Sequence, residues 1–313
     1  MSSSPEVVFA TLVGAPAEAR FSQLVSPVIS PMHMAVENDL WLVEEPGKEA
    51  RVLRVLHGDM RGDVVPEAMV EAARQAASLG VGPDILAADG TAGALLMPQL
   101  DAPWRTGSLY DLKGAAVRRG VIGATRCLHA GPALSKVFDP FSRLTTLLGR
   151  ARQIGVPLPA DADWLLDAAA QVRDAVTTSP AQLVPCRNDG CASNIMIHED
   201  GRVLLIDYDL AGMNDPAYDL GVLLAEATVF DDEAMAWVCD WQGSDDPTLL
   251  CRARMYGAVD DLAWAISAAI NAKTSARITL EFRKYSEWRF MRSRTVLADR
   301  RFEMMVRHVA GNH

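Results

Sequence analysis

The chain has 313 residues, of which 50% are hydrophobic and 22% are charged, and its formal net charge is −10. This composition is typical of a soluble globular protein with two cooperating cores, and it excludes a wholly disordered chain. Because nucleic acids and anionic membranes bind basic surfaces, we expect neither as a partner.

The five cysteines are scattered without a C-x-x-C pair, which favours reduced thiols over a disulfide framework. Cys186 and Cys191 lie five residues apart, but no second pair of ligands accompanies them, so we do not expect a zinc site. The first residues lack a basic segment followed by an apolar core, and no apolar run of about 18 residues occurs. We therefore expect a cytoplasmic protein.

The predicted elements change in character along the chain. After a lead-in segment (1–20), residues 21–102 contain β-rich runs and one helix that begins at Pro66 and ends at Gly80. From 103 to 313 the sequence is mainly helical, with one β-hairpin around Asp200-Gly201. The predicted helices lie near 113–129, 140–154, 161–177, 216–228, 232–242, 247–271 and 277–309. This order predicts an α+β, two-lobed protein-kinase-like fold with a small β-rich N-lobe (21–102) and a large, mainly helical C-lobe (103–313).

The hairpin predicts a cation site. If Asp200 and Gly201 form a two-residue turn, Asn194 faces Asp207 across the open end, roughly 5 Å away. Amide and carboxylate oxygens suit a hard cation such as Mg²⁺, which also binds substrate phosphates. Asp189 precedes Asn194 by five residues and is near enough to act as a base beside that metal.

Residues 185–221 resemble the catalytic core of choline/ethanolamine kinases and, more broadly, of the aminoglycoside phosphotransferase group. The segments Asn-Asp-x₄-Asn at 188–194 and Ile-Asp-Tyr-Asp at 206–209 carry the resemblance. In phosphoryl transfer a loop Asp accepts the hydroxyl proton, while an Asn and a later Asp hold Mg²⁺ against the ATP phosphates. The resemblance implies that Asp189 is the catalytic base and that Asn194 and Asp207 are magnesium ligands. It also implies that Asp209 is an acid facing the substrate and that Asp219 braces the catalytic loop.

The resemblance extends over about residues 34–293 and implies an ATP site. It implies that Arg54 contacts a phosphate and that Glu71 is its ion-pair partner. It also implies that residues 97–100, including Met97 and Gln99, connect the lobes and meet adenine, and that Asn38 belongs to the phosphate loop.

Three positions depart from the group's pattern. Arg187 replaces a supporting histidine, and we expect it to hold an acid or a phosphate. The phosphate loop at 34–38 lacks both of its glycines, which makes close approach of the backbone to phosphate harder. Of the paired tryptophans that line the amine pocket of choline kinases, this chain keeps Trp264 and has Ser267 in the second place. Trp264 is either a substrate contact or a core residue.

These residues predict a choline/ethanolamine kinase-like enzyme that uses ATP and Mg²⁺ to phosphorylate a small alcohol. With one aromatic face missing, choline is expected to be a poorer acceptor than ethanolamine or another polar alcohol. The alternative is a catalytically degraded pseudokinase that binds nucleotide or metabolite, as Arg187 and the missing glycines suggest. The joint presence of Asp189, Asn194 and Asp207 favours the enzyme. Aminoglycoside resistance is less favoured, because the second half of the motif is closer to the choline kinase version.

Overall fold

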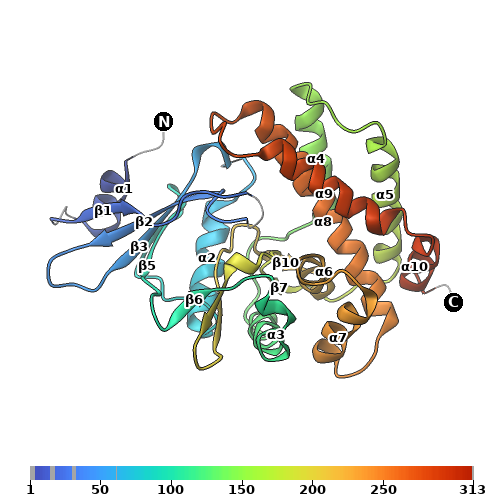
Figure 1. The fold of residues 1–313 in the computed structure, drawn as a ribbon, viewed down its shortest axis with the longest axis horizontal. Coiled ribbons are helices and arrows are strands. Elements are labelled where there is room, and N and C mark those ends of the chain that lie inside the picture. Colours follow the sequence, from blue (N-terminus) through green and yellow to red (C-terminus); the bar gives the residue numbers. More distant parts are fainter. Residues whose placement is uncertain (1–3, 15–17, 30–32, 61, 312–313) are drawn as a thin grey trace. The chain divides into compact units, whose positions relative to one another are not determined.

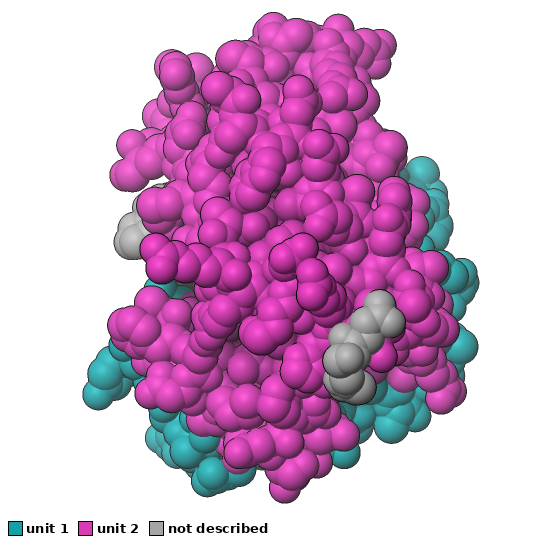
Figure 2. Space-filling model, turned by 90° about the vertical axis from the view of Figure 1, so that its right-hand side faces the viewer, with its two compact units in different colours: residues 1–137, 185–213 teal, residues 138–184, 214–313 magenta. Residues whose placement is uncertain are grey.

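The computed structural model describes residues 4–14, 18–29, 33–60 and 62–311. By their internal contacts the residues form two compact units: unit 1 comprises 1–137 and 185–213, and unit 2 comprises 138–184 and 214–313 (Figure 2). The catalytic segment and the hairpin therefore group with the N-terminal sheet. This division differs from the lobe boundary expected between residues 102 and 103, which stays a prediction.

A five-stranded antiparallel sheet, in the order β1-β2-β3-β5-β4, forms the main part of unit 1 (Figure 1). Its strands are β1 (Arg20–Gln23), β2 (Asn38–Glu44), β3 (Arg51–Leu56), β4 (Ala87–Asp89) and β5 (Ala94–Pro98). Because successive side chains of a strand point to opposite faces, β3 has two functions. Leu53 and Val55 are buried in a core with Phe9, which belongs to the nine-residue helix α1 (Pro5–Val13). Arg54, on the opposite face of β3, faces the candidate site.

The rest of unit 1 supports the catalytic segment. Helix α2 (Pro66–Ser78) begins at a proline as expected, and α3 (Ala115–His129) packs against the hairpin strand β9. The other elements are the strands β6 (Trp104–Thr106), β7 (Val184–Cys186), β8 (Ile195–His198), β9 (Val203–Leu205) and β10 (Gly212–Asn214) and the 3₁₀ turns η1 (Gly58–Met60), η2 (Asp111–Lys113) and η3 (Ala192–Asn194). β8 lies between β6 and β9 in a three-stranded sheet, and β7 pairs with β10.

The hairpin has a different register from the predicted one. Ile195 pairs with Leu205 and Ile197 pairs with Val203, a shift of one residue. The reason is a three-residue loop in place of a two-residue turn: the His198 amide donates to the Arg202 carbonyl at 2.9 Å, and Gly201 takes a φ of 91°. The loop after α2 fixes the hairpin in place, because the Leu205 amide donates to the Val81 carbonyl at 2.8 Å.

Unit 2 is built from helices: α4 (Pro140–Gln153), α5 (Ala162–Thr178), α6 (Pro216–Ala227), α7 (Asp231–Gln242), α8 (Pro247–Thr274), α9 (Phe282–Leu297) and α10 (Phe302–Val309). Three of them begin at an Asp-Pro pair in which the aspartate caps the first turn and proline takes the first helical position, at residues 139, 215 and 246. The helix expected over 277–309 is divided into α9 and α10. Among the described residues, no helix is both long enough and apolar enough to cross a membrane.

Helices α6 and α8 pack closely at two glycines. A Cβ at Gly221 would lie 2.3 Å from the Ala253 carbonyl oxygen, and one at Gly257 would lie 2.7 Å from the Gly221 carbonyl oxygen. Since real side chains do not approach backbone this closely, only glycine allows these helices to cross at this distance. With strands preceding helices in the chain and one hairpin interrupting the helices, the predicted fold class is confirmed.

Candidate active site

A pocket of about 300 Å³ lies within unit 1. One wall is the face of the sheet that carries Leu40, Val52 and Leu95, and the other includes Met196 and Ile206 of the hairpin. Its lining includes six residues that the sequence identified: Asn38, Arg54, Met97, Gln99, Asn194 and Asp207. Residues separated by more than a hundred positions therefore meet at one cavity, whose volume lies at the lower end of the range for small-molecule sites.

The segment before the hairpin holds Asp189 by both of its carboxylate oxygens. Oδ1 accepts the Cys191 amide at 2.7 Å, and Oδ2 accepts the Asn194 Nδ2 at 2.5 Å. Asn188 takes a left-handed φ of 61°, and its Nδ2 donates to the Leu210 carbonyl at 2.9 Å. Asparagine adopts this left-handed backbone region more readily than most residues, so it suits position 188. The carboxylate of Asp189 keeps 18% of its side-chain exposure, so a ligand has access to it.

Arg54 is buried and joins the sheet to the end of the hairpin. Its Nη2 donates to Asp207 Oδ1 at 3.2 Å and also to Asp209 Oδ1. The second oxygen of Asp209 accepts the Asn38 Nδ2 at 3.0 Å. Both carboxylate oxygens of Asp209 are thus engaged and the residue is 6% exposed. Asp209 is a buried anchor for Arg54 in this structure, and its expected position facing the substrate stays a prediction.

The expected ion pair between Arg54 and Glu71 is wrong. Helix α2 presents Met69 to the arginine, with the Met69 sulfur 3.5 Å from Nη1. Two residues further along a helix the side chain has turned by about 200°, so Glu71 points to another side. There its carboxylate accepts the backbone amide of Ser135 at 3.1 Å and the Ser135 hydroxyl. The acids that neutralise Arg54 come from the end of the hairpin instead.

The charge balance of the pocket favours a cation. Burial, together with the neighbouring carboxylates of Asp209, Asp189 and Glu37, raises the pKa of Asp207 to about 7 against the opposing effect of Arg54. One arginine thus does not neutralise this group of acids. Carboxylate and amide oxygens are ligands that hard divalent cations prefer, so Asp207 and Asn194 form a donor set that fits such an ion. The buried Oδ1 of Asn38 has no hydrogen-bond partner, which leaves a further free acceptor at the pocket.

The loop before β2 achieves a glycine-like shape without glycine. Ala35 takes a left-handed φ of 51°, next to Met34, which pairs with Val28 through two backbone hydrogen bonds of 2.8 and 2.9 Å. Left-handed backbone costs an L-residue about 1–2 kcal/mol, so the surrounding contacts must offset this strain. The missing glycines therefore do not prevent a left-handed turn here, and Ala35 lines the pocket.

Residues 28–250, well over half of the chain, match the family described as the phosphotransferase enzyme family (APH). The chain belongs to this family. None of the curated proteins matches the sequence.

Solved structures show the same fold as this phosphotransferase. A choline/ethanolamine kinase family protein from Mesorhizobium loti is 23% identical, with a TM-score of 0.80 and coverage of 98% of both chains. The choline kinase LicA from Streptococcus pneumoniae is 16% identical, with a TM-score of 0.75 and coverage of 94% of this chain and 97% of LicA. The amicoumacin kinase hAmiN, in complex with AMP-PNP, Ca²⁺ and Ami, is 12% identical, with a TM-score of 0.64 and coverage of 97% and 98%.

Two further residues expected at the site of the phosphotransferase lie in unit 2. Asp219 is buried in the first turn of α6, and its bracing of the catalytic loop stays a prediction. Trp264 lies on α8, where the guanidinium of Arg143 stands over its ring at 4.7 Å from the centroid. Arg143 also lies 3.6 Å from Asp260, whose other contacts include a 2.8 Å hydrogen bond from the Tyr218 hydroxyl.

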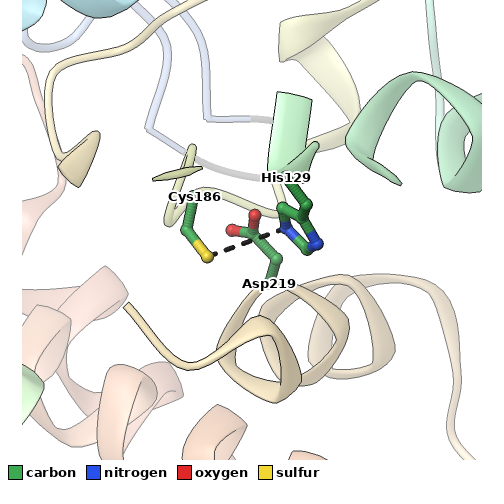
Figure 3. Close-up of side chains that lie close together, drawn as sticks. All are labelled: His129, Cys186 and Asp219. Atoms are coloured by element: carbon green, nitrogen blue, oxygen red, sulfur yellow. Dashed lines mark hydrogen bonds between the residues drawn. The ribbon is translucent and has the colours of Figure 1, made fainter. Parts of the chain in front are cut away.

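Sequence reasoning missed several features of the phosphotransferase site. Val52 shares the pocket face with Arg54, and the two-residue period of β3 was the signal that could have identified it. The buried thiol of Cys186 contacts His129 Nε2 at 3.7 Å, with no pattern in the sequence to predict it (Figure 3). Arg187, which was expected to meet an acid or a phosphate, lies 3.9 Å from the Asp189 carboxylate, and sequence reasoning missed its hydrogen bonds to backbone carbonyls.

Proposed function

We propose that this phosphotransferase transfers the terminal phosphoryl group of ATP to a hydroxyl of a small alcohol. One observation carries the proposal: a single pocket combines Arg54, Asn194 and Asp207, and Asn194 in turn holds Asp189. These are the residue types that phosphoryl transfer needs for charge neutralisation, metal binding and proton acceptance. The AMP-PNP and Ca²⁺ bound to the structurally similar hAmiN support the choice of donor and of a divalent ion.

The apolar part of the pocket suits the adenine base. Leu40, Val52 and Leu95 offer flat aliphatic surface on the sheet, and the chain leaves β5 through residues 97–100, which line the pocket. Directly after Pro98, the Gln99 amide donates to the Ala50 carbonyl at 3.1 Å. Peptide groups there would recognise the edge of the base. Arg54 would contact the phosphates.

Asn194 and Asp207 would hold the divalent ion, which we propose is Mg²⁺. When bound, the ion neutralises charge on the phosphate oxygens. The residues of the chain would position the ion and accept the proton. The Nδ2 of Asn194 binds Asp189, so its Oδ1 remains for the metal. Asp189 would accept the proton of the attacking hydroxyl, because its carboxylate is fixed by two donors and still partly exposed.

The residues around Trp264 suit a quaternary ammonium alcohol poorly. A cation would bind the face of Trp264, yet Arg143 already lies over that ring at 4.7 Å. A second cation on the same face would meet like-charge repulsion, and Ser267 stands where a second tryptophan would offer another face. We therefore propose that ethanolamine or another polar alcohol is preferred to choline.

A panel of small alcohols tests the proposal. Purified protein with ATP and Mg²⁺ is expected to release ADP only when a suitable alcohol is present, and the phosphorylated alcohol should be detectable by mass spectrometry. Asp207→Asn, with the metal ligand weakened, is the matched control and should lose this turnover. Tight nucleotide binding without any turnover across the panel would instead support a pseudokinase.

A further inference from the structure

Arg187 is a buried cation at the centre of the catalytic segment. The residue is 2% exposed, and its side chain lies 3.9 Å from the carboxylate of Asp189. Its guanidinium donates to three backbone carbonyls: Nη1 to Asn194 at 3.2 Å and to Ile206 at 2.9 Å, and Nη2 to Asp189 at 2.6 Å. All of these residues belong to unit 1. An arginine placed in this way acts on the backbone and not on a ligand.

The three carbonyls belong to three separate parts of the site. Asp189 is the proposed base, Asn194 is one proposed metal ligand, and Ile206 directly precedes Asp207, the other ligand. We propose that Arg187 is a positioning residue that fixes the spacing of the base and the two metal ligands. This inference rests on the proposed function of the same site, but it adds a residue that touches neither substrate nor metal.

Backbone strain at two positions explains why such a clamp is needed. Asn188 and Asp207 take left-handed φ values of 61° and 65°. Residues held in this region cost of order 1–3 kcal/mol each and persist only where neighbouring contacts fix them. Arg187 binds the carbonyl of Ile206, in the peptide group that precedes Asp207, and the carbonyl of Asp189, the residue that follows Asn188. Its hydrogen bonds thus hold the peptide group next to Asp207 and the backbone one residue beyond Asn188.

The geometry requires an arginine in this chain. A guanidinium presents five donors in a planar fork, so it can bind carbonyls on two separate segments at once. A lysine has its three donors on one atom, and an imidazole has at most two ring N–H groups. Arg187→Lys should keep the charge and lose the simultaneous bonds, whereas Arg187→Gln should lose the charge and keep one short donor group.

The experiment measures metal binding as well as turnover. Mn²⁺ affinity is measured by electron paramagnetic resonance with AMP-PNP present, alongside kcat, KM for ATP, and thermal unfolding. Loss of residues that orient metal ligands typically lowers metal affinity or activity by about 10- to 100-fold. We expect both variants at position 187 to bind Mn²⁺ at least about tenfold more weakly than wild type and to lose kcat with little change in KM for ATP.

Arg252→Lys is the matched control. Arg252 is also a mostly enclosed arginine, with 11% of its side chain exposed, and it donates to the Ser179 carbonyl at 2.9 Å and to Asp215 Oδ2 at 2.6 Å, all within unit 2. This variant should lower the unfolding temperature and leave Mn²⁺ affinity unchanged. If either folded variant at position 187 bound Mn²⁺ as tightly as wild type, the positioning proposal would be overturned. If wild type bound Mn²⁺ and AMP-PNP but turned over no alcohol, only the proposed function would fail, since the Mn²⁺ comparison still decides the role of Arg187.

Discussion

Replacing Asp189 by asparagine is the sharpest test of the proposed base. In the structure both oxygens of Asp189 accept N–H groups, from the Cys191 amide and from the Asn194 Nδ2. An asparagine keeps one oxygen and places an NH₂ group opposite one of these donors. The substitution therefore removes the base and also breaks one hydrogen bond at the Asn194 side chain or at the loop backbone.

The two effects differ in size. Loss of a general base typically lowers the rate by about 10²- to 10⁴-fold. A buried N–H donor left without an acceptor costs about 1–3 kcal/mol. This cost is less than the free energy of unfolding of a typical folded domain, which is about 5–15 kcal/mol. Asp189→Asn should therefore stay folded, bind ADP with little change, and lose at least about 100-fold in kcat. Coupled ADP release gives kcat, and calorimetry with ADP gives the binding constant.

Asp200→Asn provides the control for this experiment. Asp200 lies in the same hairpin but is exposed and pairs with Arg202 at 2.8 Å. Exposed ion pairs contribute little, so kcat should not change in this variant. Near-wild-type kcat in Asp189→Asn would remove Asp189 from the mechanism, whatever the result for Asp200.

Three further predictions concern backbone strain, pH and the acceptor. Ala35→Gly should raise the free energy of unfolding by about 1 kcal/mol in urea titrations, because glycine adopts the left-handed φ of 51° without strain; an unchanged midpoint would contradict this. Burial raises the pKa of Asp260 to about 6 from 3.8, so the folded state keeps a proton that the unfolded chain loses, and this group lowers stability as pH rises from about 4 to 6. Asp260→Asn should remove this pH dependence of the free energy of unfolding; equal pH dependence of urea unfolding in the two proteins would refute it. Wild type should have a lower kcat/KM for choline than for ethanolamine. Arg143→Met should raise kcat/KM for choline by up to about tenfold, because it clears the face of the Trp264 ring. Adding Trp264→Leu to this variant should abolish the gain.

The fold was predictable because its signals are local. Alternating strands, the helix start at Pro66 and the Asp-Pro helix caps each depend on residues close in sequence, and the structure places elements there. The predicted hairpin register was wrong by one residue, because the Asp200-Gly201 pair suits a two-residue turn and Gly201 also suits the third position of a three-residue loop. With Gly201 at a φ of 91°, the longer loop with a left-handed third residue is formed.

The candidate site was predictable in its residues but not in all of its pairings. Arg54 was identified from its strand, but its partners Asp207 and Asp209 lie 153 and 155 residues away in the sequence. Glu71 was the nearer acid, and the helix turn that directs it to Ser135 is fixed by how α2 packs. No local pattern shows which of two acids a buried arginine will meet, because that depends on tertiary packing.

The discontinuity of unit 1 has a consequence for synthesis of the protein. The ribosome releases residues 1–137 first, then a helical stretch that belongs to the other unit, and only afterwards residues 185–213. Until this last segment emerges, the sheet lacks Asp207 and Asp209, and Arg54 on β3 has neither of its acidic partners. In a nascent chain stalled before residue 207, Arg54 should therefore lack both of its acidic partners. Such a chain should bind chaperones and proteases more readily than one stalled past residue 213.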